Sequence, residues 1–331
     1  MKSSLSILVS GTVLATLVAC GGSGGDSSPP QGSKVAITSA NQSQVVRASV
    51  NAGLSVSLAQ GSVGGVSPAG VTDRTHALGG VLQRAMGAAR ASRKGIASAS
   101  VHPAATISDT EPCGVSGTVT IVLDDRDNNQ ALSSGDSVSA TFAQCKDSAS
   151  TTINGAIVIA LTSTPTDTQF SASANFQSVV VTDNGVTSTI SGTVTVAEND
   201  MPTVTETTLS VGSSGLTAST ASTGYDDAVS FAAGFVITTD ETSAGDVSVS
   251  LSGTMTAQSV GGSITISTPQ PIVEGSGDAY PRAGQVIITG ASGSSVRATV
   301  LDDTQVRLEL DANGDGSYES TSTVAWTALI A

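Results

Sequence analysis

Residues 116–124 read Ser-Gly-Thr-Val-Thr-Ile-Val-Leu-Asp, and residues 137–146 read Ser-Val-Ser-Ala-Thr-Phe-Ala-Gln-Cys-Lys. Apolar and polar side chains alternate in both stretches, which is typical of β-strands that bury one face and expose the other. The residues between them, 125–136, are rich in Asp, Asn, Ser and Gly, which favour turns. The two stretches therefore predict an antiparallel hairpin.

The same alternation continues to the end of the chain. It recurs at residues 157–161, 170–176, 190–196, 229–235, 247–251, 296–300, 306–310 and 324–328. Between two of these stretches, the Asn184-Gly185 pair suits a tight hairpin turn, because both turn positions need positive φ. We predict a mainly β domain over residues 111–331, built as a large antiparallel meander that forms either a sandwich or an open barrel-like sheet.

A short motif repeats within this region. Ser-Gly-Thr-Val-Thr at residues 116–120 returns at 191–195, and it returns with Met in place of Val at 252–256. Asn-Gly-Ala-Ile at residues 154–157 stands between the first two copies. The spacing is close to the length of two strands with their turns, which indicates a hairpin-sized repeat, although Ser/Thr/Gly-rich sequence also produces such matches by chance.

The first residues of the chain have the pattern of a secretory signal. Lys2 precedes an uncharged, mostly apolar stretch from Leu5 to Ala19, which is too short to cross a hydrocarbon core of ~30 Å as a helix. The stretch ends in Leu17-Val18-Ala19-Cys20. We therefore predict a signal peptide over residues 1–19.

Leu17-Val18-Ala19-Cys20 resembles the lipobox of bacterial lipoproteins. The resemblance implies that the thiol of Cys20 is acylated, that the signal is removed and that the new N-terminus is acylated too. It also implies attachment to the outer membrane, since Asp at the next position would favour the inner membrane and this chain has Gly21. The alternative is an ordinary secreted protein in which Cys20 pairs with another cysteine.

The region between the signal and the strands divides into two parts. Residues 20–33 carry the cysteine and a run of Gly, Ser, Pro and Asp, a composition that predicts a flexible tether. Residues 34–110 are predicted to be partly helical. Ser39 and Gln42 form a capping box before Val45 and Val46, and a longer amphipathic pattern starts at Asp73 and ends at Gly95. The basic residues in its last turn, Arg90, Arg93 and Lys94, suit either a solvated helix end or contact with an acidic partner or a lipid phosphate.

Charge is distributed unevenly. The whole chain has a net charge of −14, yet residues 1–110 hold eight lysines or arginines against three aspartates. The β region is therefore strongly acidic, which repels nucleic acid and favours divalent cations near the surface. We expect no nucleic-acid partner.

Three cysteines are present, and one of them is the predicted lipidation site. An exported protein meets an oxidising environment, so we predict a disulfide between Cys113 and Cys145 that closes the first hairpin. The two cysteines have opposite parity relative to the apolar positions of their strands. A one-residue bulge near Gly114 or Gly117 would bring them together.

An Asp/Asn/Gly-rich loop near the C-terminus has the spacing of a calcium site. Alternate residues there carry oxygen atoms, and Gly316 stands at the sharp turn. The candidate ligands are Asp311, Asn313, Asp315, Ser317 and Glu319. Ser322 occupies the twelfth position, where an EF-hand has Glu, so the loop is closer to the calcium turns found between strands of extracellular proteins. A metal-free turn is an equal alternative, because these residues also favour turns by themselves.

A second acidic stretch lies in the first hairpin. It contains Asp124, Asp125, Asp127 and Asn129 but no glycine in register after them. We interpret this stretch as a plain turn rather than a metal site.

The sequence gives little support for catalysis. The two histidines, His76 and His102, stand far from any strand-end serine or pair of carboxylates. We therefore expect no enzyme activity, and a hydrolase with a carboxylate pair is the least favoured alternative.

The chain as a whole resembles uncharacterised β-rich proteobacterial lipoproteins. The resemblance rests on the lipobox, the Gly/Ser tether, Tyr280-Pro281-Arg282-Ala283-Gly284, residues 286–290, residues 306–310 and the Asp/Gly turn. That family implies no established activity. We expect a structural or binding role at the periphery of the outer membrane, with the membrane and an unidentified protein or glycan as partners. A calcium-dependent adhesin or glycan-binding protein is the alternative.

Overall fold

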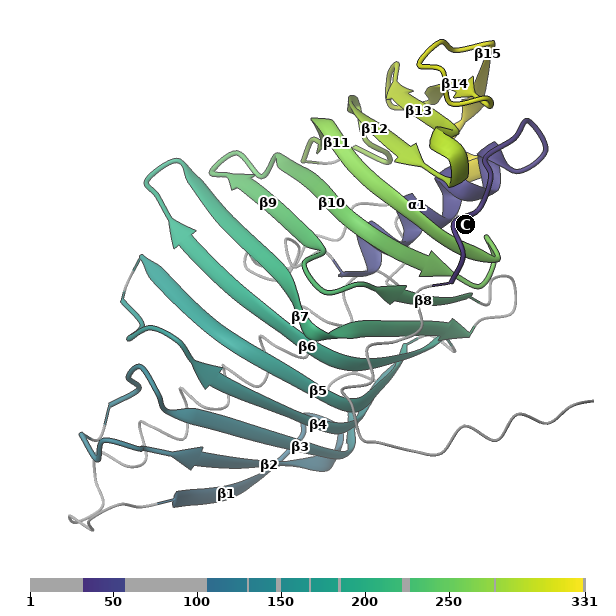
Figure 1. Cartoon of the computed structure of the whole chain (residues 1–331). Coiled ribbons are helices and arrows are strands. Elements are labelled where there is room, and N and C mark those ends of the chain that lie inside the picture. Colours follow the sequence, from purple (N-terminus) through teal and green to yellow (C-terminus); the bar gives the residue numbers. More distant parts are fainter. Residues whose placement is uncertain are drawn as a thin grey trace, which may run out of the picture.

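The computed structural model describes residues 32–56 and 106–329, except residues 130, 147–149, 167, 184–185, 222–226 and 277. This part of the chain forms one 15-stranded sheet in which every pair of strands is antiparallel (Figure 1). The prediction of a mainly β, antiparallel meander is confirmed. The strands form one continuous open sheet with β1 and β15 at its two ends.

The strands have the following bounds. They are β1 (Thr106–Pro112), β2 (Ser116–Asp124), β3 (Ser137–Lys146), β4 (Thr151–Leu161), β5 (Gln169–Asp183), β6 (Val186–Asp200), β7 (Val204–Ala221), β8 (Asp227–Phe231), β9 (Val236–Thr242), β10 (Val247–Ala257), β11 (Gly262–Glu274), β12 (Ala283–Thr289), β13 (Ser295–Val300), β14 (Gln305–Asp311) and β15 (Ser320–Ala325). The described helical elements are α1 (Gln42–Val56), the 3-10 turn η2 (Ala291–Gly293) and α3 (Trp326–Leu329).

Two short strands share one position in the sheet. The long strand β7 pairs with β9 through residues 204–210 and with β8 through residues 216–220. Both β8 and β9 then pair with β10 on their other side. Together β8 and β9 therefore take the place of one strand between β7 and β10. The residues between Phe231 and Val236 interrupt it.

Alternation along the strands creates one buried and one exposed face. In β4, for example, Ile157, Ile159 and Leu161 are buried, whereas Ala160 between them is exposed. Val, Ile, Leu and Phe supply most of the buried face from β2 to β14, and Thr and Ser dominate the opposite face. None of the described side chains of the outermost strands β1 and β15 is buried. This period of two made most of the strands predictable from the sequence. The prediction is wrong for residues 326–328, which form part of helix α3 and do not continue the last strand.

A line of bulges crosses the sheet. Strand pairing shifts register next to Gly117, Gly155, Gly192 and Gly253, and each of these glycines has positive φ. They are the glycines of the predicted repeat. Bulges bend the strands and increase their twist, and the sheet is curved and strongly twisted in Figure 1.

The first bulge has the effect predicted for it. Pairing between β2 and β3 shifts between Ser116 and Thr118, beside Gly117. Cys113 and Cys145 form a disulfide with their Cα atoms 5.4 Å apart, and both are buried. The predictions of the disulfide and of the bulge are confirmed.

Helix α1 begins later than the predicted capping box. The residue before the helix is Asn41, whose backbone oxygen accepts a hydrogen bond from the backbone N–H of Val45 at 2.9 Å. Its side chain turns back to accept from the Thr38 N–H and to donate to the Ala36 oxygen. The prediction of Ser39 as the cap is therefore wrong, because the chain makes a turn through residues 38–41 before the helix starts.

Val45 and Val46 of α1 are buried, and the helix packs against α3 and against β12, β13 and β14. None of the described helices is long and apolar enough to cross a membrane. The predicted helix of residues 73–95, both histidines, the signal peptide and Cys20 lie outside the described residues.

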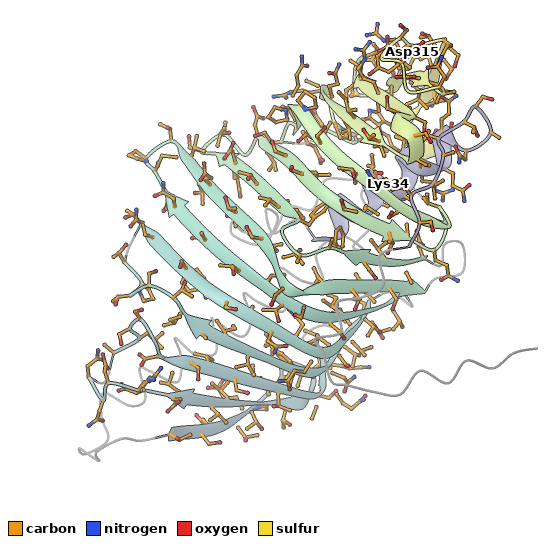
Figure 2. All side chains as sticks on the ribbon, in the orientation of Figure 1. Lys34 and Asp315 are labelled. Carbon is orange, nitrogen blue, oxygen red and sulfur yellow. A yellow bond between two sulfur atoms is a disulfide. The ribbon has the colours of Figure 1, made fainter. Side chains whose placement is uncertain are left out.

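The described N-terminal segment joins one edge of the sheet. Lys34 forms a parallel bridge with Ser263, and the Val35 N–H donates to the Ser263 oxygen. Figure 2 shows Lys34 close to α1, and its bridge partner Ser263 belongs to β11. Successive turns of an antiparallel meander lie alternately at the two sides of the sheet where the strands end. We name these sides the β2–β3 edge and the β14–β15 edge, after a turn that each contains; they are distinct from the outermost strands β1 and β15. The N-terminal segment lies at the β14–β15 edge, where β11 begins.

Candidate calcium-binding loops

The predicted calcium loop connects β14 with β15 (Figure 2). Asp311 is the last residue of β14 and is buried, and its two carboxylate oxygens accept the N–H groups of Gly314 at 2.6 Å and Gly316 at 2.9 Å. At the other end, the Glu319 Oε2 accepts the Ala312 N–H at 2.9 Å. These bonds wrap the backbone around the carboxylates, because short polar side chains stabilise such turns.

Three carboxylates converge inside this loop. Oxygens of Asp311, Asp315 and Glu319 all lie within 4.8 Å of one another. The Ser317 N–H, which donates to the Asp315 carboxylate, is the largest of the causes that lower the pKa of Asp315. A carboxylate has about four lone-pair directions, so these oxygens keep capacity for a cation after accepting one N–H each. Calcium takes oxygen ligands of this kind.

The other two predicted ligands, Asn313 and Ser317, both contact Asp315. The Asn313 Oδ1 accepts the Asp315 N–H at 2.8 Å, and its Nδ2 donates to the Asp315 Oδ2. Ser317 donates its N–H to Asp315. Both residues therefore hold Asp315 in place in the structure.

The neighbouring hairpins support the loop. A Cβ atom at Gly314 would collide with the backbone of Ser292 and Gly293 in η2, and Gly314 itself has a φ of 77°. Beside it, Arg297 of β13 donates two hydrogen bonds to the Glu309 carboxylate at 2.8 and 2.9 Å. The guanidinium of Arg297 also lies 4.2 Å from the ring centre of Tyr318, in a cation–π contact.

The β2–β3 turn contains a second group of carboxylates. Oxygens of Asp125, Asp127 and Asp136 lie within 4.8 Å of one another. Asp136 is buried and accepts the N–H groups of Arg126 at 2.9 Å and Ser133 at 2.7 Å. The Ser133 hydroxyl lies 3.0 Å from both the Asp127 and the Asp136 carboxylates.

Asp136 is the residue that the sequence interpretation did not include. It stands at the twelfth position counted from Asp125, with Asp127 third and Asn129 fifth. These are ligand positions of an EF-hand loop, with Asp in place of the usual Glu at the end. This spacing could have identified Asp136 from the sequence. It is less evident because Gln130 occupies the sixth position, at which an EF-hand loop has glycine.

The remaining residues of the acidic stretch, Asp124 and Asn129, make contacts within the hairpin. Asp124 is the last residue of β2 and pairs with Ser137 of β3. The Asn129 amide donates to the Asp127 Oδ2 at 2.8 Å, and the Asn129 Oδ1 accepts the Ala131 N–H. The two carboxylate groups lie on opposite edges of the sheet, one at the β2–β3 edge and one at the β14–β15 edge.

In comparisons with known proteins, no family model matches this sequence, and neither a curated protein nor a solved structure matches it.

Proposed function

We propose that this chain is a lipid-anchored protein of the outer-membrane periphery with a structural or binding role and no catalysis. The observation that carries the proposal is Leu17-Val18-Ala19-Cys20 at the end of an apolar segment preceded by Lys2. Three acyl chains on Cys20 would hold the protein at the membrane, because each buried CH₂ contributes ~0.8 kcal/mol and two chains are already sufficient.

The position of the N-terminal segment indicates which edge of the sheet the proposed anchor would hold near the membrane. Residues 21–32 contain only Gly, Ser, Pro, Asp and Gln. A Gly/Ser-rich chain of this length has an end-to-end distance of roughly 20 Å. Since residues 33–35 bind beside Ser263 at the β14–β15 edge, the proposed anchor would hold that edge near the membrane and leave the β2–β3 edge facing away.

A calcium-dependent binding protein is the second candidate, and a separate observation favours it. Each edge of the sheet carries three carboxylates whose oxygens lie within 4.8 Å of one another. Both groups arise from sequences with the alternate-residue spacing of calcium loops. Calcium would remove the mutual repulsion of the carboxylates and stiffen the loops that a partner protein or glycan would contact.

Cell fractionation tests the anchor. The wild-type protein is expected in the membrane fraction, and Cys20→Ser is expected in the periplasm or the medium. Cys113→Ser together with Cys145→Ser is the matched control, because it removes cysteines without touching the lipobox, and it should stay with the membrane. If Cys20→Ser also stays with the membrane, the proposed anchor is wrong.

A further inference from the structure

At the end of β11 stands a carboxylate with one buried oxygen that has no hydrogen-bond partner among the described residues. Glu274 is the last residue of this strand and pairs with Val247 of β10, which pairs in turn with Glu241 of β9. The Oε1 of Glu274 is buried and accepts no hydrogen bond. No ion pair involves Glu274 in the part of the chain that the structure describes.

The loop after β11 brings further charges next to Glu274. Asp278 accepts the Gly275 N–H at 2.7 Å and lies 3.4 Å from one nitrogen of Arg282. The other terminal nitrogen of Arg282 lies 2.9 Å from Asp246, in the turn between β9 and β10. Asp278 is the charge that acts on Glu274. The adjacent strands and loop also carry Glu241, Asp246, Tyr280 and Arg282. Arg282 neutralises Asp246 and Asp278 and leaves Glu274 without a cation.

This environment favours the neutral form of Glu274. Burial, with a smaller contribution from the charge of Asp278, raises the pKa of Glu274 to about 7. An ionised carboxylate loses hydration when it is buried, and a like charge nearby adds repulsion. Both effects therefore favour the protonated form of Glu274.

The same loop reaches the C-terminal helix. The Pro281 oxygen accepts a hydrogen bond from the Trp326 Nε1 at 3.1 Å, and the Tyr280 ring stacks on the Trp326 ring with a centroid distance of 6.3 Å. Trp326 is buried and begins α3, which packs against α1. A movement of residues 278–282 would therefore change the surroundings of Trp326.

We propose that Glu274 and residues 278–282 form a pH-sensitive latch that holds the C-terminal helix. When Glu274 is neutral, residues 278–282 stay packed beside it. Pro281 and Tyr280 then hold Trp326 together with the Asp302 oxygen, which lies 3.3 Å from the Trp326 Nε1. When Glu274 is ionised, its repulsion from Asp278 loosens the loop and exposes Trp326. The latch would release the α1 and α3 end of the sheet as the surroundings become alkaline.

The chain contains a single tryptophan, so Trp326 fluorescence reports on the latch directly. We expect a red shift of the emission between about pH 5 and about pH 9, with a midpoint near 7 as for Glu274. Glu274→Gln should keep the low-pH spectrum throughout. Calcium is left out and a chelator is added, so that the carboxylate loops do not contribute.

His76 and His102 require a control, because an ordinary histidine also titrates near pH ~6.5. His76→Gln with His102→Gln should keep the transition. Asp278→Asn provides a second test that leaves Glu274 in place, and it should move the midpoint to lower pH. A flat wild-type titration, a transition that persists in Glu274→Gln, or an unchanged midpoint in Asp278→Asn would overturn the latch.

Discussion

Gly117 of β2 lies directly against the backbone carbonyl of Gln144 in β3, and both residues have positive φ, 80° for Gly117 and 49° for Gln144. This contact is the first of the bulges that cross the sheet. It shifts the register by one residue and so allows Cys113 and Cys145 to meet. Glycine is needed there because any Cβ would collide with the neighbouring strand.

Gly155→Ala should destabilise the sheet by about 2 to 4 kcal/mol, because it combines an unfavourable positive φ with overpacking. The new Cβ would lie 2.6 Å from the Ser178 oxygen and 2.8 Å from the Val179 Cα. Gly261→Ala is the matched control, since Gly261 also has positive φ but nothing lies within 4 Å of its Cβ position. It should cost only about 1 kcal/mol. Urea denaturation measures both values, and equal losses would show that the bulge contact contributes nothing.

Removal of the disulfide should lower the free energy of unfolding by about 3 to 4 kcal/mol, because the bridge closes the loop from Cys113 to Cys145 in the unfolded chain. The two cysteines are separated by 32 residues. Chemical denaturation of Cys113→Ala with Cys145→Ala, in a Cys20→Ser background, gives the value. Thiol titration of the denatured, unreduced Cys20→Ser protein should find no free thiol. Two thiols would refute the bridge.

Calcium should raise the melting temperature of the wild-type protein. Binding to the folded state alone contributes ~2.7 kcal/mol at a hundredfold excess over the dissociation constant. Asp315→Ala should remove the part due to the β14–β15 loop, and Asp127→Asn should remove the part due to the β2–β3 loop. Both residues are exposed, so neither substitution creates a cavity.

Asp303→Ala is the control for calcium, because Asp303 is an exposed acidic residue outside both carboxylate groups. It should leave the calcium-dependent rise unchanged. If millimolar calcium produces no rise in the wild-type protein, both loops are plain turns and the second candidate function is wrong.

The ion pair between Arg297 and Glu309 should make stability depend on acidity. The Arg297 hydrogen bond and charge lower the pKa of Glu309 below its ordinary 4.5. A carboxylate with a lowered pKa stabilises the fold above its unfolded pKa, and this contribution is lost as the pH falls through the folded pKa. Arg297→Gln should therefore cost about 1 to 3 kcal/mol at neutral pH. The difference from wild type should shrink below about pH 4, as measured by urea denaturation across the pH range. A difference that does not change with pH would exclude the charge as its cause.

Most strands were predictable because their alternation of apolar and polar residues is local. The predicted stretches do not include β1, β7, β9, β11 and β12. In these stretches Val, Ile, Leu or Phe alternates with Thr or Ser. This alternation predicts a strand from neighbouring residues alone, without knowledge of which strand it pairs with. The opposite parity of Cys113 and Cys145 even predicted a bulge. The way in which strands share positions was not predictable, since β8 and β9 occupy one place only because the long strand β7 can pair with both.

The candidate sites were predictable only in part. The β14–β15 loop keeps its carboxylates within nine residues and has Gly316 at the turn, so its spacing is visible in the sequence. In the β2–β3 turn, Asp136 is eleven residues from Asp125 and becomes a neighbour only when the hairpin closes. The start of α1 depended on tertiary contacts of residues 33–37 with β11 and η2, which a local capping pattern does not contain.

The mass of the mature N-terminus shows directly whether Cys20 carries the proposed anchor. The wild-type protein should be extracted with detergent from a bacterium that processes lipoproteins, digested, and its N-terminal peptide measured by mass spectrometry. We predict a peptide that begins at Cys20 and carries a thioether-linked diacylglyceryl group and an amide-linked acyl chain. A mature protein that begins at another residue, or one in which Cys20 carries no lipid, would contradict the proposed membrane anchor.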